Sequence, residues 1–199
     1  MFTAHSSIQK RKFVRYGYGL LIFLFAFVAF SCTPVIMLIY GVHQPSYKSD
    51  EAVINFSKRL GLEREIYRLK GYSEESMPRF RYTGNSMPGM LLFNSNGQLT
   101  KFELDCSGGL DSIARLSPHD IDNMSLAEKS FQAFMDDTYV INTPEKDNLS
   151  KLSKPLYVIK FAEYGGLLNK DNVPGLVSRL ESRNDVDYIL LNVDYTVKK

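Results

Sequence analysis

A long uncharged segment near the N-terminus sets the first constraint on this chain. Between Arg15 and Lys48 there is no Asp, Glu, Lys or Arg, and the stretch from Tyr16 to Tyr40 is almost wholly apolar. As a helix this stretch would extend about 37 Å at about 1.5 Å per residue, which exceeds the roughly 30 Å hydrocarbon core of a bilayer. We therefore predict a membrane-spanning helix over residues 16–40.

Basic residues indicate the orientation of that helix. Lys10, Arg11, Lys12 and Arg15 precede it, and no comparable basic group directly follows it. Because basic flanks stay in the cytoplasm, residues 1–15 are expected to be cytoplasmic and residues 41–48 to form a linker. Residues 49–199 are then a domain outside the cytoplasm, and the expected location is the cell membrane, crossed once.

A lipoprotein signal is the alternative interpretation of the same segment. Its apolar part would run from Leu20 to Phe30, with Ser31 before the cleavage site and Cys32 carrying the lipid. The apolar run Val35–Tyr40 argues against this, because a lipoprotein normally has a polar tether after its cysteine. Both interpretations put the domain on the same side of the membrane.

Composition limits what the domain can be. It has about 150 residues, enough for one domain with its own core. The net charge of the chain is +2 and its acids and bases are interspersed, so nothing indicates a nucleic-acid partner. The two cysteines are Cys32 and Cys106, so the domain cannot close an internal disulfide.

Residue patterns predict alternating helices and strands, and hence an α/β domain. The expected elements are a helix starting at Ser49-Asp50-Glu51, a short strand Glu65–Leu69, a hairpin from Met90 to Leu104 that turns at Asn96-Gly97, a helix Leu110–Leu116 ended by Ser117-Pro118, a helix Ser125–Asp137 with Glu128 in a capping box, a strand Leu156–Phe161, a helix Asn172–Ser182 with Pro174 in its first turn, and a strand Tyr188–Val193. The last three predict a right-handed parallel βαβ unit.

Three segments together resemble the thioredoxin family. Lys154–Leu168 is similar to the strand and active-site turn of that family, whose turn reads Ala-x-Trp-Cys-Gly-Pro-Cys. Leu191–Asp194 is similar to the family's strand that ends in Val-Asn-Val-Asp, and Ser86–Gly97 resembles its cis-proline loop and the hairpin after it. Cys106–Leu116 would match the final turn and helix.

The resemblance implies a three-layer α/β domain with a mixed sheet. The half with the cis-proline loop precedes the half with the active-site turn, which implies a circular permutation of the family's order. Chain ends that meet at the surface make such permutations tolerable. Another type of α+β domain is the alternative.

This chain lacks the family's two reactive cysteines. Gly165 and Leu168 stand at their positions. Thiol–disulfide exchange needs an attacking thiolate and a resolving thiol, so the resemblance does not carry this reaction over. It implies instead a binding groove lined by five residues, namely Met87, Pro88, Tyr164, Gly165 and Gly166. The expected function is non-catalytic binding of another exported or membrane protein.

Two other functions stay open from the residues alone. Cys106 precedes Ser107-Gly108-Gly109, a turn that could expose it as a single redox thiol. The chain could instead be a small structural subunit of a membrane complex, recognised through its helix. His119, Asp120 and Asp122 have the residue types of a metal site, but their spacing suits a solvated loop better. We expect no metal, no cofactor and no small-molecule ligand.

Overall fold

The computed structural model describes residues 39–83, 89–101, 112–142 and 152–197. Residues 1–15 and most of the predicted membrane segment lie outside these ranges, as do Met87, Pro88 and Cys106. Within the described ranges, no helix is long and apolar enough to cross a membrane. The chain divides into two compact units, Met1–Tyr40 and Gly41–Lys199, and the elements below belong to the second.

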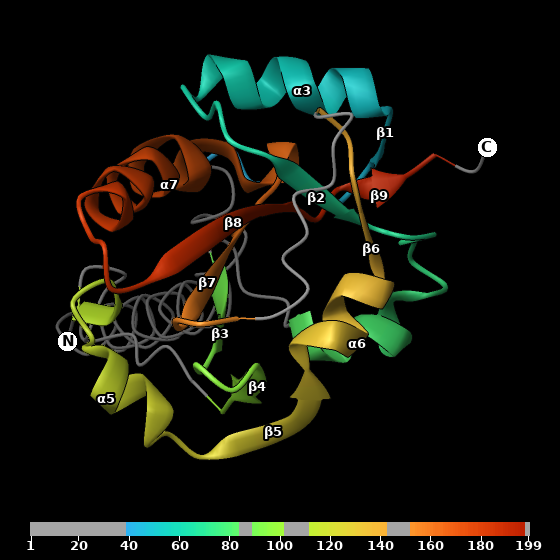
Figure 1. The fold of residues 1–199 in the computed structure, drawn as a ribbon. Helices are drawn as coiled ribbons and strands as arrows, with labels where there is room; N and C mark the ends of the chain where they lie inside the picture. The colour runs from blue at the N-terminus through green and yellow to red at the C-terminus, as the bar shows by residue number, and fades with distance from the viewer. Residues whose placement is uncertain (1–38, 84–88, 102–111, 143–151, 198–199) are drawn as a thin grey trace, which may run out of the picture. The chain divides into compact units, whose positions relative to one another are not determined.

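A curled, mixed sheet of seven strands forms the centre of this α/β domain (Figure 1). Its order is β5 (Leu126–Ser130), β4 (Gln98–Thr100), β3 (Gly89–Phe93), β7 (Leu156–Phe161), β8 (Asp187–Asn192), β2 (Ile66–Leu69) and β6 (Thr138–Val140). The strands β7, β8 and β2 run parallel to one another, and the remaining neighbours are antiparallel. A separate parallel pair joins β1 (Tyr47–Lys48) to β9 (Tyr195–Thr196).

Helices pack against both faces of the sheet because side chains along each strand alternate between two apolar clusters. The first cluster joins Ile159 and Leu190 to α3 (Asp50–Arg59), α5 (Pro118–Asp122) and α7 (Gly166–Glu181). The second joins Val158 and Leu191 to α6 (Phe131–Asp136) and to the 3-10 helix η1 (Met77–Thr83). Figure 1 shows α3 and α7 together on one side and α6 on the other.

Several sequence predictions are confirmed. Ser49 caps α3 by accepting a hydrogen bond from the Ala52 N–H. The strands β3 and β4 form the expected antiparallel hairpin, and Gly97 adopts the positive φ of 75° that its turn requires. The two long apolar runs are the central strands β7 and β8, which are parallel and linked through α7.

The predicted helix Ser125–Asp137 is wrong in its first half. Residues 126–130 form β5, which pairs with β4 at the edge of the sheet. The helix α6 begins only at Phe131, because Ser130 caps it by accepting from the Ala133 N–H. Leu126, the first residue of β5, is 47% exposed. Cross-strand pairing therefore overrides the local capping pattern.

Two other boundaries also differ. The helix predicted at Asn172–Ser182 begins earlier, as α7 at Gly166, so Pro174 lies inside it rather than in its first turn. Ser117-Pro118, expected to end a helix, also opens the next helix, α5, because Ser117 and Asp120 form a reciprocal capping box. The same helix contains His119 and Asp122, which were expected in a loop.

Candidate functional site

Three of the predicted groove residues, Tyr164, Gly165 and Gly166, lie at the carboxyl edge of the parallel strands β7, β8 and β2. In open α/β sheets this edge is where ligands generally bind. Tyr164 and Gly165 belong to η2 (Glu163–Gly165), a 3-10 turn that links β7 to Gly166 at the start of α7. Gly89 is the register partner of Lys160, so β3 also begins at this edge. The other predicted groove residues, Met87 and Pro88, lie outside the described ranges.

Two buried side chains, Asn169 and Asp194, hold the main chain of the turn in place through hydrogen bonds. Asn169, which is 0% exposed, donates from Nδ2 to the Ala162 carbonyl at 2.7 Å and accepts from the Ala162 N–H at 3.4 Å. Asp194 accepts from the Glu163 N–H at 2.9 Å and from Asn192 Nδ2 at 2.8 Å, both at Oδ2. The main chain of the turn is therefore fixed by the end of β8 and by the first turns of α7.

Gly165 has no room for a side chain. A Cβ atom there would lie 1.7 Å from Asn169 Nδ2. This amide is buried and bound to Ala162, so it cannot swing away without losing its hydrogen bonds. Gly166 follows with a positive φ of 55°, which disfavours any L-residue. The packing around Gly165 and the positive φ of Gly166 account for glycine at these two positions.

The turn carries one carboxylate, that of Glu163, and one phenol, that of Tyr164, which packs against the second apolar cluster. Glu163 forms ion pairs with Lys48 and with Arg59, and the hydrogen bond from Lys48 is the main cause that lowers the pKa of Glu163. Tyr164 is half-buried, and burial raises its pKa, with a smaller contribution from Tyr72. At neutral pH the turn therefore presents one fixed negative charge beside a neutral aromatic ring.

An extended segment of the chain itself lies across this edge, and we call residues 43–48 the strap. The His43 N–H donates to the Tyr164 carbonyl at 2.9 Å, and the Tyr195 N–H donates to the Ser46 carbonyl at 3.1 Å. Tyr47 and Lys48 then pair in parallel with β9. The expected linker 41–48 thus belongs to the compact unit that begins at Gly41.

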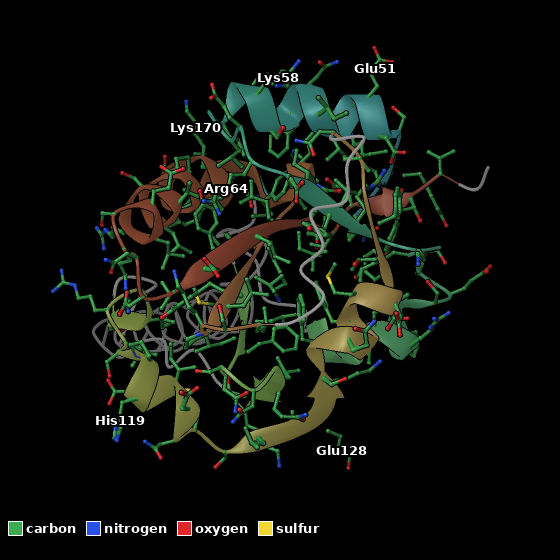
Figure 2. All side chains as sticks on the ribbon, in the orientation of Figure 1. Glu51, Lys58, Arg64, His119, Glu128 and Lys170 are labelled. Carbon is green, nitrogen blue, oxygen red and sulfur yellow. The ribbon has the colours of Figure 1, made fainter. Side chains whose placement is uncertain are left out.

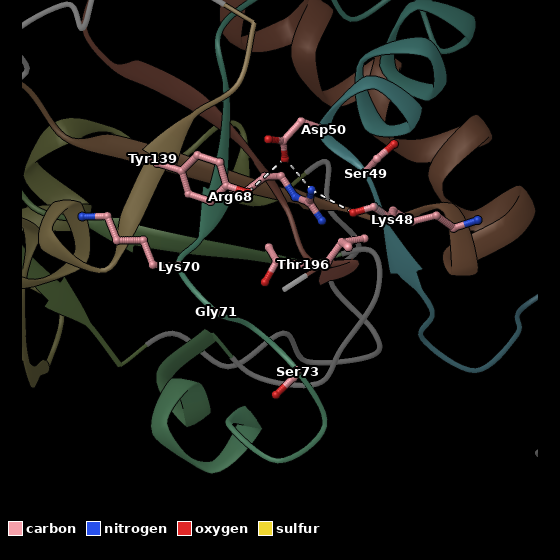
Figure 3. Close-up of a pocket in the computed structure, with 10 residues that line it drawn as sticks. Lys48, Ser49, Asp50, Arg68, Lys70, Gly71, Ser73, Tyr139 and Thr196 are labelled. Carbon is pink, nitrogen blue, oxygen red and sulfur yellow. Dashed lines mark hydrogen bonds and ion pairs between the residues drawn. The ribbon is translucent and has the colours of Figure 1, made fainter. Parts of the chain in front are cut away.

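A hollow of about 500 Å³ opens beside the strap, at the end of β2 (Figure 3). It is lined by Lys48, Ser49, Asp50, Arg68, Lys70, Gly71, Ser73, Tyr139, Thr196 and Val197. Figure 3 shows the amines of Lys48 and Lys70 pointing away from Arg68 to opposite sides. Lys48 pairs with Glu163, and Lys70 Nζ donates to the Asp136 carbonyl at 2.8 Å. The lysine charges therefore lie at the margins of the hollow.

Arg68 connects the elements around the hollow, although it is only 1% exposed. Its Nη1 donates to Asp50 Oδ1 at 2.7 Å and to the Lys48 carbonyl at 3.1 Å, and its Nη2 donates to the Tyr195 carbonyl at 3.0 Å. Tyr139 also donates to Asp50, and burial raises the pKa of Tyr139 to about 12, so its proton stays in place. Arg68 thus holds β1, β9 and the start of α3 together.

Sequence reasoning missed Arg68, although the sequence contains a signal. Within Ile66-Tyr67-Arg68-Leu69, a lone arginine interrupts an apolar strand whose four residues are all buried. A guanidinium in such a strand needs several acceptors, because burying an unpaired charge is very costly. The pattern indicates a structural clamp, but its acceptors come from residues distant in sequence.

Two further ionisable groups are buried near the edge. Lys160 is 2% exposed, and burial lowers its pKa to about 8. Asp194 is 1% exposed, and burial raises its pKa. Its Oδ1 has no hydrogen-bond partner among the described residues, as is also true of Arg68 Nε. Neither Lys160 nor Asp194 is accessible enough to act on a substrate in this conformation.

Within the described ranges, no cluster of three His, Cys, Asp or Glu side chains could hold a metal ion. Figure 2 shows His119 pointing outward from α5, as Glu51 and Lys58 do from α3. Cys106, the candidate redox thiol, lies outside the described ranges.

Comparison of the chain with protein-family models, with curated proteins and with solved structures finds no match.

Proposed function

We propose that this protein is a membrane-anchored, non-catalytic binding protein whose thioredoxin-like domain holds another exported or membrane protein. The anchor is the apolar segment from Tyr16 to Tyr40, with the domain outside the cytoplasm. The mixed sheet supports the thioredoxin comparison in one respect: the parallel strands β7 and β8 are central, and the hairpin of β3 and β4 lies directly beside β7.

One observation carries the binding proposal: the main chain of the turn already accepts an extended segment. The Tyr164 carbonyl accepts a hydrogen bond from His43, and β9 pairs with the strap four to five residues further along. Main-chain pairing of this kind is how many domains bind extended peptides, with side-chain contacts adding specificity. The same edge can therefore offer main-chain groups to a partner.

The packing of the turn favours binding over thiol chemistry. Gly165 lacks space for even a Cβ atom, and the turn is held rigidly by Asn169 and Asp194. A rigid main chain loses little conformational entropy when a partner binds. The proposed function uses that rigidity and needs no reactive group at the turn.

Site-specific photo-crosslinking in native membranes tests the proposal. A photo-reactive residue at Leu167, which is 44% exposed beside the turn, should give a discrete adduct with a membrane or exported protein. The matched control is Leu126, which is 47% exposed on the edge strand β5 and should give no such adduct. Absence of an adduct at Leu167, or the same adduct from both positions, would contradict the proposal.

A further inference from the structure

The surface under the strap has a defined chemical character. The Tyr164 carbonyl accepts a hydrogen bond from a strap N–H. Arg68 Nη1 and the Tyr195 N–H each donate to a carbonyl of the strap. The Tyr195 ring lies 5.4 Å from the Tyr47 ring. The Glu163 carboxylate takes the Lys48 ammonium. The surface therefore fits an extended segment in which an aromatic residue is followed by a basic one.

Burial of side chains contributes little to holding the strap in place. No residue from 41 to 48 is buried, and the Tyr47 side chain is 54% exposed. A segment that buries little apolar surface opens locally at a low free-energy cost compared with the core. The strap can therefore leave the surface while the sheet stays folded.

The surface keeps its charge when the strap leaves. Arg59 Nη2 also contacts Glu163, at 3.2 Å, so the carboxylate retains one cationic neighbour without Lys48. Asp50 continues to hold Arg68, because it belongs to α3 rather than to the strap. Glu163 and Arg68, the two side chains that would bind a partner, therefore remain in position.

We propose that the partner protein replaces the strap with an extended segment of its own, in which an aromatic residue followed by Lys or Arg pairs in parallel with β9. This inference rests on the proposed binding function and specifies the class of partner segment. Through the strap, the chain competes in cis with that partner. The local concentration of a tethered segment is on the order of millimolar, so the strap raises the partner concentration needed for binding.

A peptide added in trans to the full-length chain in detergent micelles tests this inference. The probe is a fluorescent, capped peptide with the sequence of residues 41–48. It should bind a Tyr47→Ala/Lys48→Ala chain about tenfold more tightly than the unaltered chain, because the variant strap has lost its ring contact and its ion pair. The matched control is His43→Ala/Gln44→Ala, which keeps the main-chain bond of residue 43 and should leave the affinity unchanged.

Two further variants probe the chemistry of recognition. A peptide with the changes Tyr47→Ala and Lys48→Glu should bind the weakened chain at least tenfold more weakly than the unaltered peptide. Adding Glu163→Gln to the weakened chain should cause a similar loss for the unaltered peptide. Equal binding of both peptides, or no binding to a folded weakened chain, would overturn the inference and leave the crosslinking result at Leu167 unaffected.

Hydrogen exchange of the unaltered chain gives an independent measurement that needs no variant. The His43 N–H belongs to the strap and donates to the Tyr164 carbonyl, and the Tyr195 N–H donates to the Ser46 carbonyl of the strap. The Leu190 N–H, in contrast, lies inside β8. The first two should exchange at least a hundredfold faster than the third, because the strap opens locally. Exchange of all three at the same slow rate would show that the strap opens only on global unfolding, and would overturn the inference.

Discussion

Replacing Gly165 by alanine should destabilise the domain by disrupting the buried bonds behind the turn. The new Cβ would lie 1.7 Å from Asn169 Nδ2, so the amide has to move. That movement breaks both of its bonds to Ala162, and the Ala162 N–H and the amide lose their partners. The Ala162 carbonyl keeps its bond from the Gly165 N–H at 3.1 Å.

The expected magnitude follows from the number of buried groups left unpaired. Each costs about 1–3 kcal/mol, so the two together cost roughly 4 kcal/mol. Alanine recovers up to about 1 kcal/mol through the lower backbone entropy of the unfolded chain. The net loss in free energy of unfolding should therefore be about 3 kcal/mol.

Urea unfolding of the full-length chain, followed by circular dichroism, measures this loss. With a typical slope of about 2 kcal/mol per molar urea, the midpoint should fall by about 1.5 M. Gly175→Ala, in the helix α7 that follows the turn, is the matched control, since nothing lies within 4 Å of its added Cβ. It should raise stability by about 0.5–1 kcal/mol, because alanine favours the helix interior.

A double-mutant cycle identifies the cause. In an Asn169→Ala background the Ala162 N–H is already unpaired and the added methyl group of Gly165→Ala has space. The second substitution should therefore cost little, giving a coupling energy of about 2 kcal/mol or more. A loss below about 1 kcal/mol for Gly165→Ala alone, or strictly additive effects, would refute this reasoning.

The buried charges give three more predictions. Lys160 has a folded-state pKa of about 8 against an ordinary 10.5, so burying its charge costs stability below pH 8 and this cost disappears as the pH rises towards 10.5. Lys160→Met should thus be more stable than the unaltered chain at pH 7 by up to about 3 kcal/mol, and the difference should shrink by about 2 kcal/mol at pH 9.5; a pH-independent difference would contradict this. Asp194 has a raised pKa, so its protonated form favours the fold and stability falls as the pH rises above its ordinary value. Asp194→Asn should therefore gain stability relative to the unaltered chain between pH 4 and pH 7, measured as urea midpoints, and a constant offset would count against it. Arg68→Met should cost about 3 kcal/mol, because it removes the ion pair with Asp50 and the donors to the Lys48 and Tyr195 carbonyls, and it should speed hydrogen exchange at Tyr195. Arg68→Lys should not restore the lost stability, because an ammonium lacks the forked geometry.

Sequence patterns located the elements whose signals are local. The runs Leu156–Phe161 and Tyr188–Val193 are buried on both faces, so they contain little but apolar residues and could be identified as central strands. The hairpin turn could be predicted because Gly97 needs a positive φ. Ser49 could be identified as a cap because its side chain bonds within the same helix turn.

Elements that depend on distant partners could not be predicted in this way. The strand β9 contains two residues and exists because β1, about 150 positions earlier in the chain, pairs with it. The strand β5 has the local pattern of a helix start, and only its pairing with β4 makes it extended. Pairing of this kind follows from the three-dimensional arrangement and leaves no local period in the sequence.

The candidate site also has some features that the sequence alone predicts and others that depend on contacts between distant segments. The sequence by itself determined the apolar segment Tyr16–Tyr40, the α/β class and the absence of a cysteine pair at Gly165 and Leu168, since each depends on residue types in a continuous stretch. Only the tertiary structure decided that Asn169 excludes a side chain at Gly165. It also decided that Arg68 clamps the strap beside the turn, because the acceptors of Arg68 lie up to 127 residues away from it in the chain. Burial and hydrogen bonding between distant segments are properties of the packed chain, so the turn's rigidity and its covering strap emerge only in the folded domain.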